Sequence, residues 1–127
     1  MAERYAAKVV EPLTFTPLHR LELRTALRGR VYRKTLTPDK LKEALQKNVD
    51  QLSDGFLRHV SMPWAEALRE AERIGELHVA ETGVRTGDLL HVASAVALRA
   101  QEFVSFDQRQ TELARRVGLK VRLWKFD

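Results

Sequence analysis

The sequence has no cysteine, no long apolar run and no low-complexity tract. Without cysteine, disulfides, thiolate metal sites and thiol nucleophiles are excluded, so any metal must bind through oxygen or nitrogen. No apolar run approaches the roughly 18 residues that a membrane helix needs, and the first residues, MAERYAAKVVEPL, show no signal-peptide pattern. We therefore expect a cytoplasmic protein that is not inserted in a membrane.

Glycine and proline are also scarce, and no Gly/Ser-rich linker divides the 127 residues. A chain of this length fits one domain with one core, and 44% hydrophobic residues are enough to build it. We therefore expect a single domain over residues 1–127. The excess of 22 Lys+Arg over 17 Asp+Glu favours anionic partners without choosing among nucleic acid, membrane surface and acidic protein.

Apolar spacing and turn residues predict helices that alternate with short strands. The predicted strands are Pro12–Thr16, Arg58–Met62, Glu102–Phe106 and Leu119–Trp124. The predicted helices are Ala2–Val10, one from Leu18 to about Lys34, one from Thr37-Pro38 to about Gly55, one from Pro63 to Gly83, one from Asp88 to about Ala100 with Thr86 as N-cap, and Gln108–Val117. Strands separated by helices predict an α/β fold with a parallel sheet flanked by helices.

Three acidic residues lie where predicted strands give way to helices. Asp107 directly follows the strand EFVSF, Asp88 lies in the first turn of an apolar helix, and Glu22 lies one turn into the helix after PLTFT. Ligands of open parallel sheets bind at the carboxyl ends of the strands, so the three acids could converge there. Carboxylates without a nearby lysine repel one another unless a hard cation such as Mg²⁺ or Mn²⁺ relieves them. Such ions support phosphoryl displacement by water.

Each acid also has a purely structural interpretation: Asp107 as a helix cap, Asp88 as a partner of the helix dipole, and Glu22 as a solvated residue. The alternatives to an oxygen-ligated metal find less support in the sequence. The histidines are scattered without zinc-site spacing, and no GxGxxG, Walker or GxSxG motif occurs.

Three segments resemble the PIN-domain family, specifically the VapC-type toxins of toxin-antitoxin systems: PLHRLELRTALR, RTGDLLHVASAVAL and EFVSFDQRQTELARRVGLKV. Glu22, Asp88 and Asp107 fall on three of the family's four acidic metal-site positions, and Ser105 falls on a small hydroxyl position before the last acid. The resemblance implies a three-layer PIN-like fold. Thr86 and His91 would support the site.

The resemblance also implies a function: a Mg²⁺- or Mn²⁺-dependent ribonuclease in which water, activated by the metal, attacks an RNA phosphodiester. Glu22, Asp88 and Asp107 would hold the metal. Separately from the resemblance, Arg20, Arg24 and Arg109 are expected near the same edge, where they would either bind RNA phosphates or be solvated surface arginines. Proteins of this family form homodimers and are silenced by a cognate antitoxin, so we expect both partners besides RNA.

The family normally begins with an apolar strand that ends in the first acid, and the segment before PLTFT carries no such pattern. We therefore expect a PIN-like domain that is N-terminally truncated relative to the family. An alternative function follows, in which the chain is a catalytically impaired PIN-like remnant that acts as an interaction or dimerisation protein. A basic RNA-binding module without catalysis is a third possibility.

Overall fold

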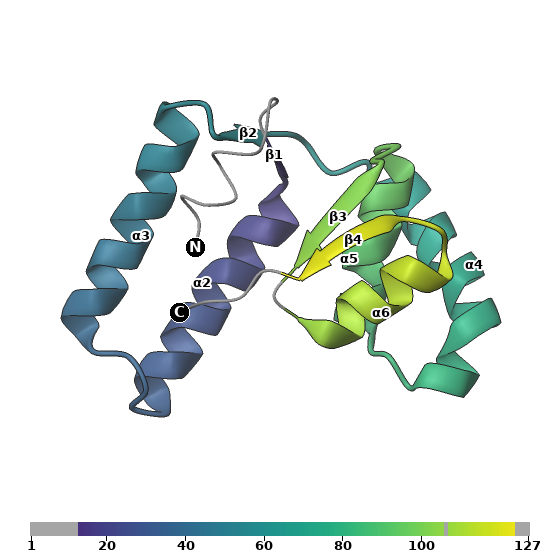
Figure 1. Cartoon of the computed structure of the whole chain (residues 1–127), viewed down its shortest axis with the longest axis horizontal. Helices are drawn as coiled ribbons and strands as arrows, with labels where there is room; N and C mark the ends of the chain where they lie inside the picture. The colour runs from purple at the N-terminus through teal and green to yellow at the C-terminus, as the bar shows by residue number, and fades with distance from the viewer. Residues whose placement is uncertain (1–12, 106, 124–127) are drawn as a thin grey trace. The chain divides into compact units, whose positions relative to one another are not determined.

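The computed structural model describes residues 13–105 and 107–123, which divide into two compact units, residues 2–61 and residues 62–127 (Figure 1). The predicted helix Ala2–Val10 and the predicted lack of an N-terminal strand lie outside the described residues, as do Phe106 and Trp124. The single domain expected from the sequence stays a prediction.

The first unit is a strand pair joined by a helical hairpin. Strands β1 (Leu13–Phe15) and β2 (Leu57–His59) pair in parallel, with Leu13 opposite Leu57 and Phe15 opposite His59. Between them run helices α2 (Pro17–Tyr32) and α3 (Pro38–Ser53), which contact each other (Figure 1). A parallel pair needs such a crossover, and here two helices supply it.

Threonine-proline pairs begin both helices of this unit. Thr16 caps α2: its Oγ1 accepts from the backbone N–H of His19 at 3.3 Å, while the Nδ1 atom of His19 accepts from the backbone N–H of Thr16 at 3.0 Å. Thr37 caps α3 in the same way, accepting from the Lys40 backbone N–H at 3.2 Å. Proline follows each cap because its fixed φ suits the first helical position and its missing N–H costs no bond there.

The second unit holds α4 (Trp64–Thr82), α5 (Thr86–Ala97), β3 (Glu102–Ser105), α6 (Gln108–Arg116) and β4 (Lys120–Leu123). β3 and β4 are parallel neighbours, with Glu102 opposite Lys120 and Phe103 opposite Val121. Figure 1 shows them side by side with α6 beside them, and α6 also contacts α5, which packs along α4. Gly83 ends α4 in the left-handed conformation (φ 67°), a geometry that glycine adopts without steric cost.

The hydrophobic core of the described residues lies in this second unit, between α4, α5, α6 and the β3–β4 pair. Its buried members are Ala71, Ile74, Val84, Val92, Ala93, Phe103, Leu113 and Ala114. In contrast, α2 has no buried residue. Helix α5 supplies the centre of this core, as its apolar sequence predicts.

The predicted mixed α/β class with parallel strands is confirmed. Among the described residues the strands form two separate pairs, so a single continuous sheet stays a prediction. No helix in the described part of the chain combines the length and apolar character that a bilayer crossing requires.

Several predicted boundaries are wrong. Thr86 is the first helical residue of α5 and Arg85 is its N-cap. α2 ends at Tyr32 and α5 at Ala97 because Lys34 and Arg99, close after them, turn to positive φ (60° and 58°).

The second strand is shorter than predicted, and it begins one residue earlier. It covers Leu57–His59 instead of Arg58–Met62, because its partner β1 has only three residues to pair with.

Candidate functional site

Asp88 is a buried carboxylate with both oxygens engaged. It lies in the first turn of α5 and is 9% exposed. Its Oδ2 accepts a hydrogen bond from the Arg85 backbone N–H at 3.3 Å, and its Oδ1 accepts one from Nε2 of Gln110 at 3.3 Å. The first of these bonds satisfies a helix-terminal N–H, so the dipole-partner role considered from the sequence is present. The second bond connects α5 to α6.

Gln110 connects this carboxylate to the end of β3. Its side chain is 3% exposed, and its Oε1 accepts a hydrogen bond from Ser105 Oγ at 2.9 Å. Ser105 Oγ in turn accepts the Asp107 backbone N–H at 3.0 Å. A continuous chain of hydrogen bonds therefore runs from the carboxylate of Asp88 through Gln110 and Ser105 to the backbone of Asp107. We call these four residues the acid relay.

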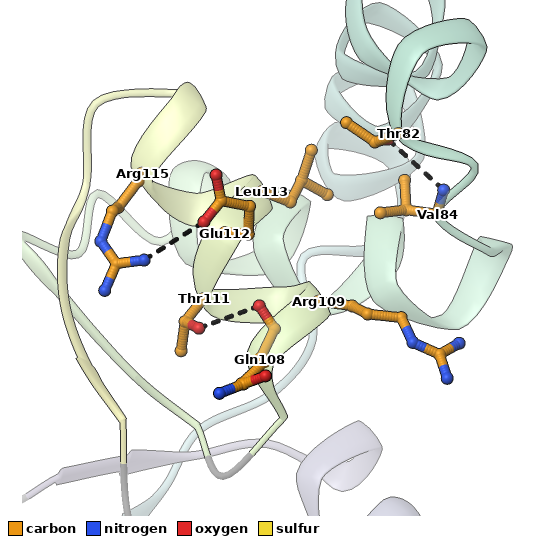
Figure 2. A pocket seen from close by; sticks show the side chains of 8 residues that line it. All are labelled: Thr82, Val84, Gln108, Arg109, Thr111, Glu112, Leu113 and Arg115. Atoms are coloured by element: carbon orange, nitrogen blue, oxygen red, sulfur yellow. Dashed lines mark hydrogen bonds and ion pairs between the residues drawn. The ribbon is translucent and has the colours of Figure 1, made fainter.

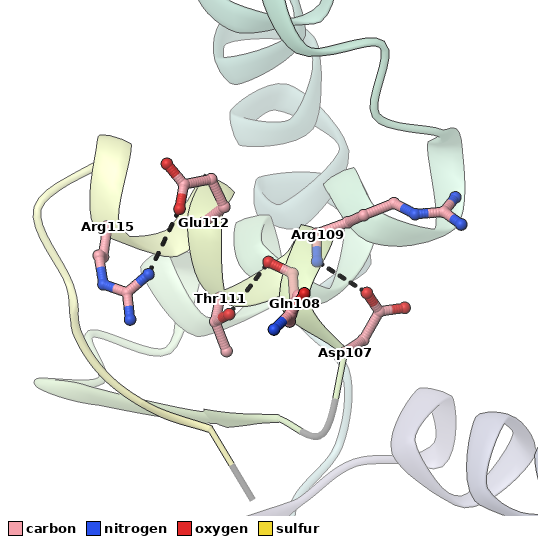
Figure 3. A network of polar contacts seen from close by, with 6 residues as sticks. All are labelled: Asp107, Gln108, Arg109, Thr111, Glu112 and Arg115. Carbon is pink, nitrogen blue, oxygen red and sulfur yellow. Dashed lines mark hydrogen bonds and ion pairs between the residues drawn. The ribbon is translucent and has the colours of Figure 1, made fainter.

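Asp107 is the N-cap of α6. Its Oδ1 accepts the Arg109 backbone N–H at 2.8 Å, and Figure 3 shows the carboxylate turned back over the first turn of the helix. The capping role considered from the sequence is thus present. The side chain is half-buried, and no hydrogen bond to Oδ2 occurs among the described residues. One carboxylate oxygen caps the helix and the other remains available to a ligand.

The two supporting residues predicted beside the acids lie in α5 on either side of Asp88. Thr86 is exposed at the start of the helix, whereas His91, almost one turn after Asp88, is buried. Ser94, one turn before the end of α5, is also buried, and its Oγ donates to the His91 backbone oxygen at 2.8 Å. The functional roles of Thr86 and His91 stay predictions.

The remaining predicted site residues divide between the units. Arg109 lies beside Asp107 in α6, while Glu22, Arg20 and Arg24 belong to α2. The contacts of residues 62–127 bring Asp88, Ser105 and Asp107 together. That Glu22 joins them stays a prediction.

Within the described residues, no group of three or more histidine, aspartate or glutamate side chains is placed to hold a metal ion. The carboxylate oxygens of the acid relay nevertheless suit Mg²⁺ or Mn²⁺ as ligands. Both are hard cations that take oxygen ligands, and Mg²⁺ often binds through only one or two carboxylates and keeps several waters. Asp88 and Asp107 supply two carboxylates, and neither makes an ion pair in the part of the chain that the structure describes.

A hollow of about 460 Å³ lies between α6 and the connection from α4 to α5 (Figure 2). It is lined by Thr82, Val84, Gln108, Arg109, Thr111, Glu112, Leu113 and Arg115. Two of its hydroxyls are satisfied by backbone oxygens: Thr82 donates to His78 at 2.8 Å and Thr111 to Gln108 at 3.0 Å. Arg115 pairs with Glu112 at 3.3 Å (Figures 2 and 3). The hollow contains none of the three predicted acids.

Two residues that the sequence interpretation missed carry important contacts. Gln110 lies three and four residues before the buried Leu113 and Ala114, on the same face of α6. This spacing in the sequence could have indicated that Gln110 is buried. Asn48 likewise occupies a buried position in α3 and accepts a hydrogen bond from Arg24 Nη1 at 3.0 Å. A polar residue at an apolar position of an amphipathic helix indicates a specific partner.

No protein-family model matches this chain, and no curated protein sequence matches it either.

Proposed function

We propose that this protein is a cytoplasmic Mg²⁺- or Mn²⁺-dependent ribonuclease of the PIN-domain, VapC type, with a PIN-like fold, RNA as substrate, a homodimeric form and a cognate antitoxin. The acid relay is the observation that carries the proposal. It connects two acids, separated in the sequence and predicted from it as metal ligands, through two buried polar side chains. The resemblance supplies the reaction, and the relay supplies a physical reason why these acids hold fixed positions.

The relay holds Asp88 in place before any ligand binds. Gln110 donates to one oxygen of Asp88 and the Arg85 backbone to the other, so the carboxylate has little rotational freedom. Each oxygen retains a further lone pair for a cation. A ligand set that is already ordered loses less entropy on binding, which favours a metal site over a solvated acidic surface.

Asp88 and Asp107 are the residues that would hold the ion, and we assign Glu22 as the third ligand on the sequence resemblance alone. When bound, the ion supplies Lewis acidity and a water of lowered pKa. Gln110 orients the carboxylate of Asp88, Ser105 holds Gln110 and the backbone of Asp107, and Thr86 and His91 support the site. Arg20, Arg24 and Arg109 bind phosphates of the RNA.

The structural roles of the acids decide which variant tests the proposal. Asp88→Asn would leave an amide NH₂ facing one of two N–H donors, so it would disturb the fold as well as a metal site. Asp107→Asn is cleaner, because asparagine caps a helix about as well as aspartate and removes only the charge. Glu22→Gln tests the third ligand separately.

The experiment is Mn²⁺ titration calorimetry of the parent, Asp107→Asn and Glu22→Gln, with RNA cleavage measured in the same preparations. We expect Mn²⁺ binding and cleavage in the parent and a loss of at least tenfold in affinity for each variant. Asp39→Asn, at an exposed position in α3, is the charge-matched control and should bind like the parent. A parent that binds neither Mn²⁺ nor Mg²⁺ would overturn the proposal.

A second candidate function is a non-catalytic interaction or dimerisation protein. It is favoured by Trp64 and Leu68, each 50% exposed and one turn apart on α4. Large apolar side chains adjacent on a helix surface are typical of protein contacts. Trp64→Ser with Leu68→Ser should then shift sedimentation from dimer to monomer, while Asp107→Asn leaves it unchanged. Because the ribonuclease is also proposed as a dimer, the second function further requires that the parent dimer shows no Mn²⁺-dependent cleavage of RNA.

A further inference from the structure

Three arginines form a row on α2. Arg20, Arg24 and Arg28 follow one another at four-residue spacing, so each advances about 6 Å along the helix and neighbours the next on its surface. Arg20 and Arg28 are exposed, and Arg24 between them is half-buried. The row thus presents three positive charges in a line. We call it the arginine row.

This row is uncompensated within the chain as described. The ion pairs found there involve other residues, and none neutralises a guanidinium of the arginine row. Burial lowers the pKa of Arg24, and the neighbouring charges of Arg20 and Arg28 lower it further. Like charges four residues apart destabilise a helix. The fold therefore keeps three adjacent like charges that no carboxylate of the described residues neutralises.

Asn48 of α3 gives a second, independent indication. Its side chain is 2% exposed, and its Oδ1 accepts a hydrogen bond from Arg24 Nη1 at 3.0 Å. Because a guanidinium only donates, the amide must turn its oxygen toward Arg24, and its Nδ2 is left without an acceptor among the described residues. A buried donor without a partner is unfavourable. The unpaired Nδ2 is the consequence of a hydrogen bond from Arg24 to Asn48 that holds the Arg24 side chain in one orientation.

We infer that the arginine row is a binding strip for the phosphodiester backbone of a single RNA strand, with Arg24 preset by Asn48. Successive guanidinium groups along a straight helix edge match the succession of phosphates along one extended strand. Each guanidinium presents a planar fork of donors that fits phosphate oxygens. The strip recognises the charge and the spacing of the phosphates, so it binds RNA without sequence preference.

The choice of RNA over another polyanion rests on the proposed function. The inference extends it in two ways: Arg28 joins the phosphate contacts, and Asn48 becomes a positioning residue. A strip of this kind would hold the strand independently of metal. This independence separates the test of the strip from the test of the ribonuclease.

The experiment measures the binding of a fluorescently labelled, mixed-sequence single-stranded RNA to the full chain by anisotropy, in EDTA, over a series of salt concentrations. The variant replaces Arg20, Arg24 and Arg28 by glutamine. Each lost phosphate contact lowers the slope of log affinity against log salt by about 0.7, so the triple variant should lose about 2 in slope. The same relation gives an affinity loss on the order of 100-fold at 0.1 M salt.

The matched control replaces Arg69, Arg73 and Arg116 by glutamine, which removes the same charge from α4 and α6. Two of these arginines pair with Glu70 and Glu81, so the control should keep most of the parent's slope. Equal losses in both triple variants would overturn the strip, since net charge alone would then explain binding. The inference would also be overturned if the chain bound poly-glutamate tightly through the arginine row and did not bind RNA. The ligand of the row would then be an acidic protein.

Asn48→Asp tests the positioning role. The carboxylate would take the place of the amide, pair with Arg24 and neutralise the middle of the row, so RNA affinity should fall about fivefold to tenfold. Gln101→Glu adds the same charge at an exposed position of the other unit and should have little effect. If Asn48→Asp binds RNA as tightly as Gln101→Glu, Asn48 does not position Arg24. Asp107→Asn should bind RNA like the parent even if it loses metal and cleavage.

Discussion

The side chain of Gln110 satisfies two polar groups at once, which makes it a sensitive position in the second unit. Replacing it by leucine keeps the volume of the helix face but removes the partner of both Asp88 Oδ1 and Ser105 Oγ. Leaving buried groups unpaired costs about 1–3 kcal/mol, so Gln110→Leu should lower the free energy of unfolding by that amount.

Urea denaturation measures this loss for Gln110→Leu. Gln108→Leu, two residues away at an exposed position, is the control and should stay within about 0.5 kcal/mol of the parent. If the two variants are equally stable, the relay contributes nothing to the fold.

Arg28 is the member of the arginine row whose removal should stabilise the protein. The pKa of Arg24 is lowered in the folded protein, so the Arg24 guanidinium holds its proton more strongly in the unfolded chain than in the folded one. The destabilisation is therefore fully present at neutral pH and is relieved only as pH rises above the folded-state pKa.

Arg28→Gln removes one of the charges that cause this destabilisation. It should raise the free energy of unfolding by about 0.2–0.5 kcal/mol at low salt. Thermal unfolding at two salt concentrations checks it, since the gain should shrink as salt screens the row. A decrease in stability would mean that Arg28 makes a favourable contact in the fold.

At the scale of elements, the cap of α6 is Asp107, whose carboxylate both accepts a backbone hydrogen bond and carries a negative charge. Asp107→Ala removes the cap and should cost about 1 kcal/mol, whereas Asp107→Asn should cost only a few tenths. Circular dichroism during urea unfolding distinguishes the two. Equal losses for alanine and asparagine would mean that the charge of Asp107, rather than its capping geometry, stabilises the helix.

The sequence predicted the start of a helix well at Thr37 and Asp107, but not at Thr86, which also has a side chain suited to capping and yet is the first helical residue of α5. Thr37 with Pro38 and Asp107 all begin helices as expected, and Gly83 ends one. The errors fall at Arg85, Lys34 and Arg99, which have no strong intrinsic preference for the cap or left-handed conformations that they adopt. Local preference decides in the first group, and tertiary packing decides in the second.

The candidate site was predictable in part for a related reason. Strand ends and helix starts reveal Asp88 and Asp107 because a carboxylate at such a position has local consequences. Gln110 contacts Asp88, which lies 22 positions earlier in the sequence, and Asn48 contacts Arg24, which lies 24 positions earlier. No local sequence pattern specifies partners that far apart.

At the scale of the whole molecule, the two units differ in how much apolar surface they bury. The core cluster lies in residues 62–127, while the buried side chains of residues 13–61 are Phe15, Thr16, Asn48 and Leu57. Local opening follows such differences, so amides of α2 and α3 should exchange with solvent faster than those of α5.

Native-state hydrogen exchange followed by mass spectrometry tests this ordering. α4 offers an internal comparison within the better-packed unit, because it buries Ala67, Ala71 and Ile74 on one face. Uniform protection of α2, α3 and α5 would show that the chain opens only as a whole.

The confinement of each strand pair to its own unit also affects how the protein is made. β1 and β2 both lie within residues 13–59, so the strand pair described in the first unit needs no residue of the second unit. At roughly 5–20 residues per second, a ribosome needs several seconds to add residues 62–127. During that time the half with the smaller core is present without the other half, and we expect the charged side chains of its two helices to oppose aggregation of the nascent chain.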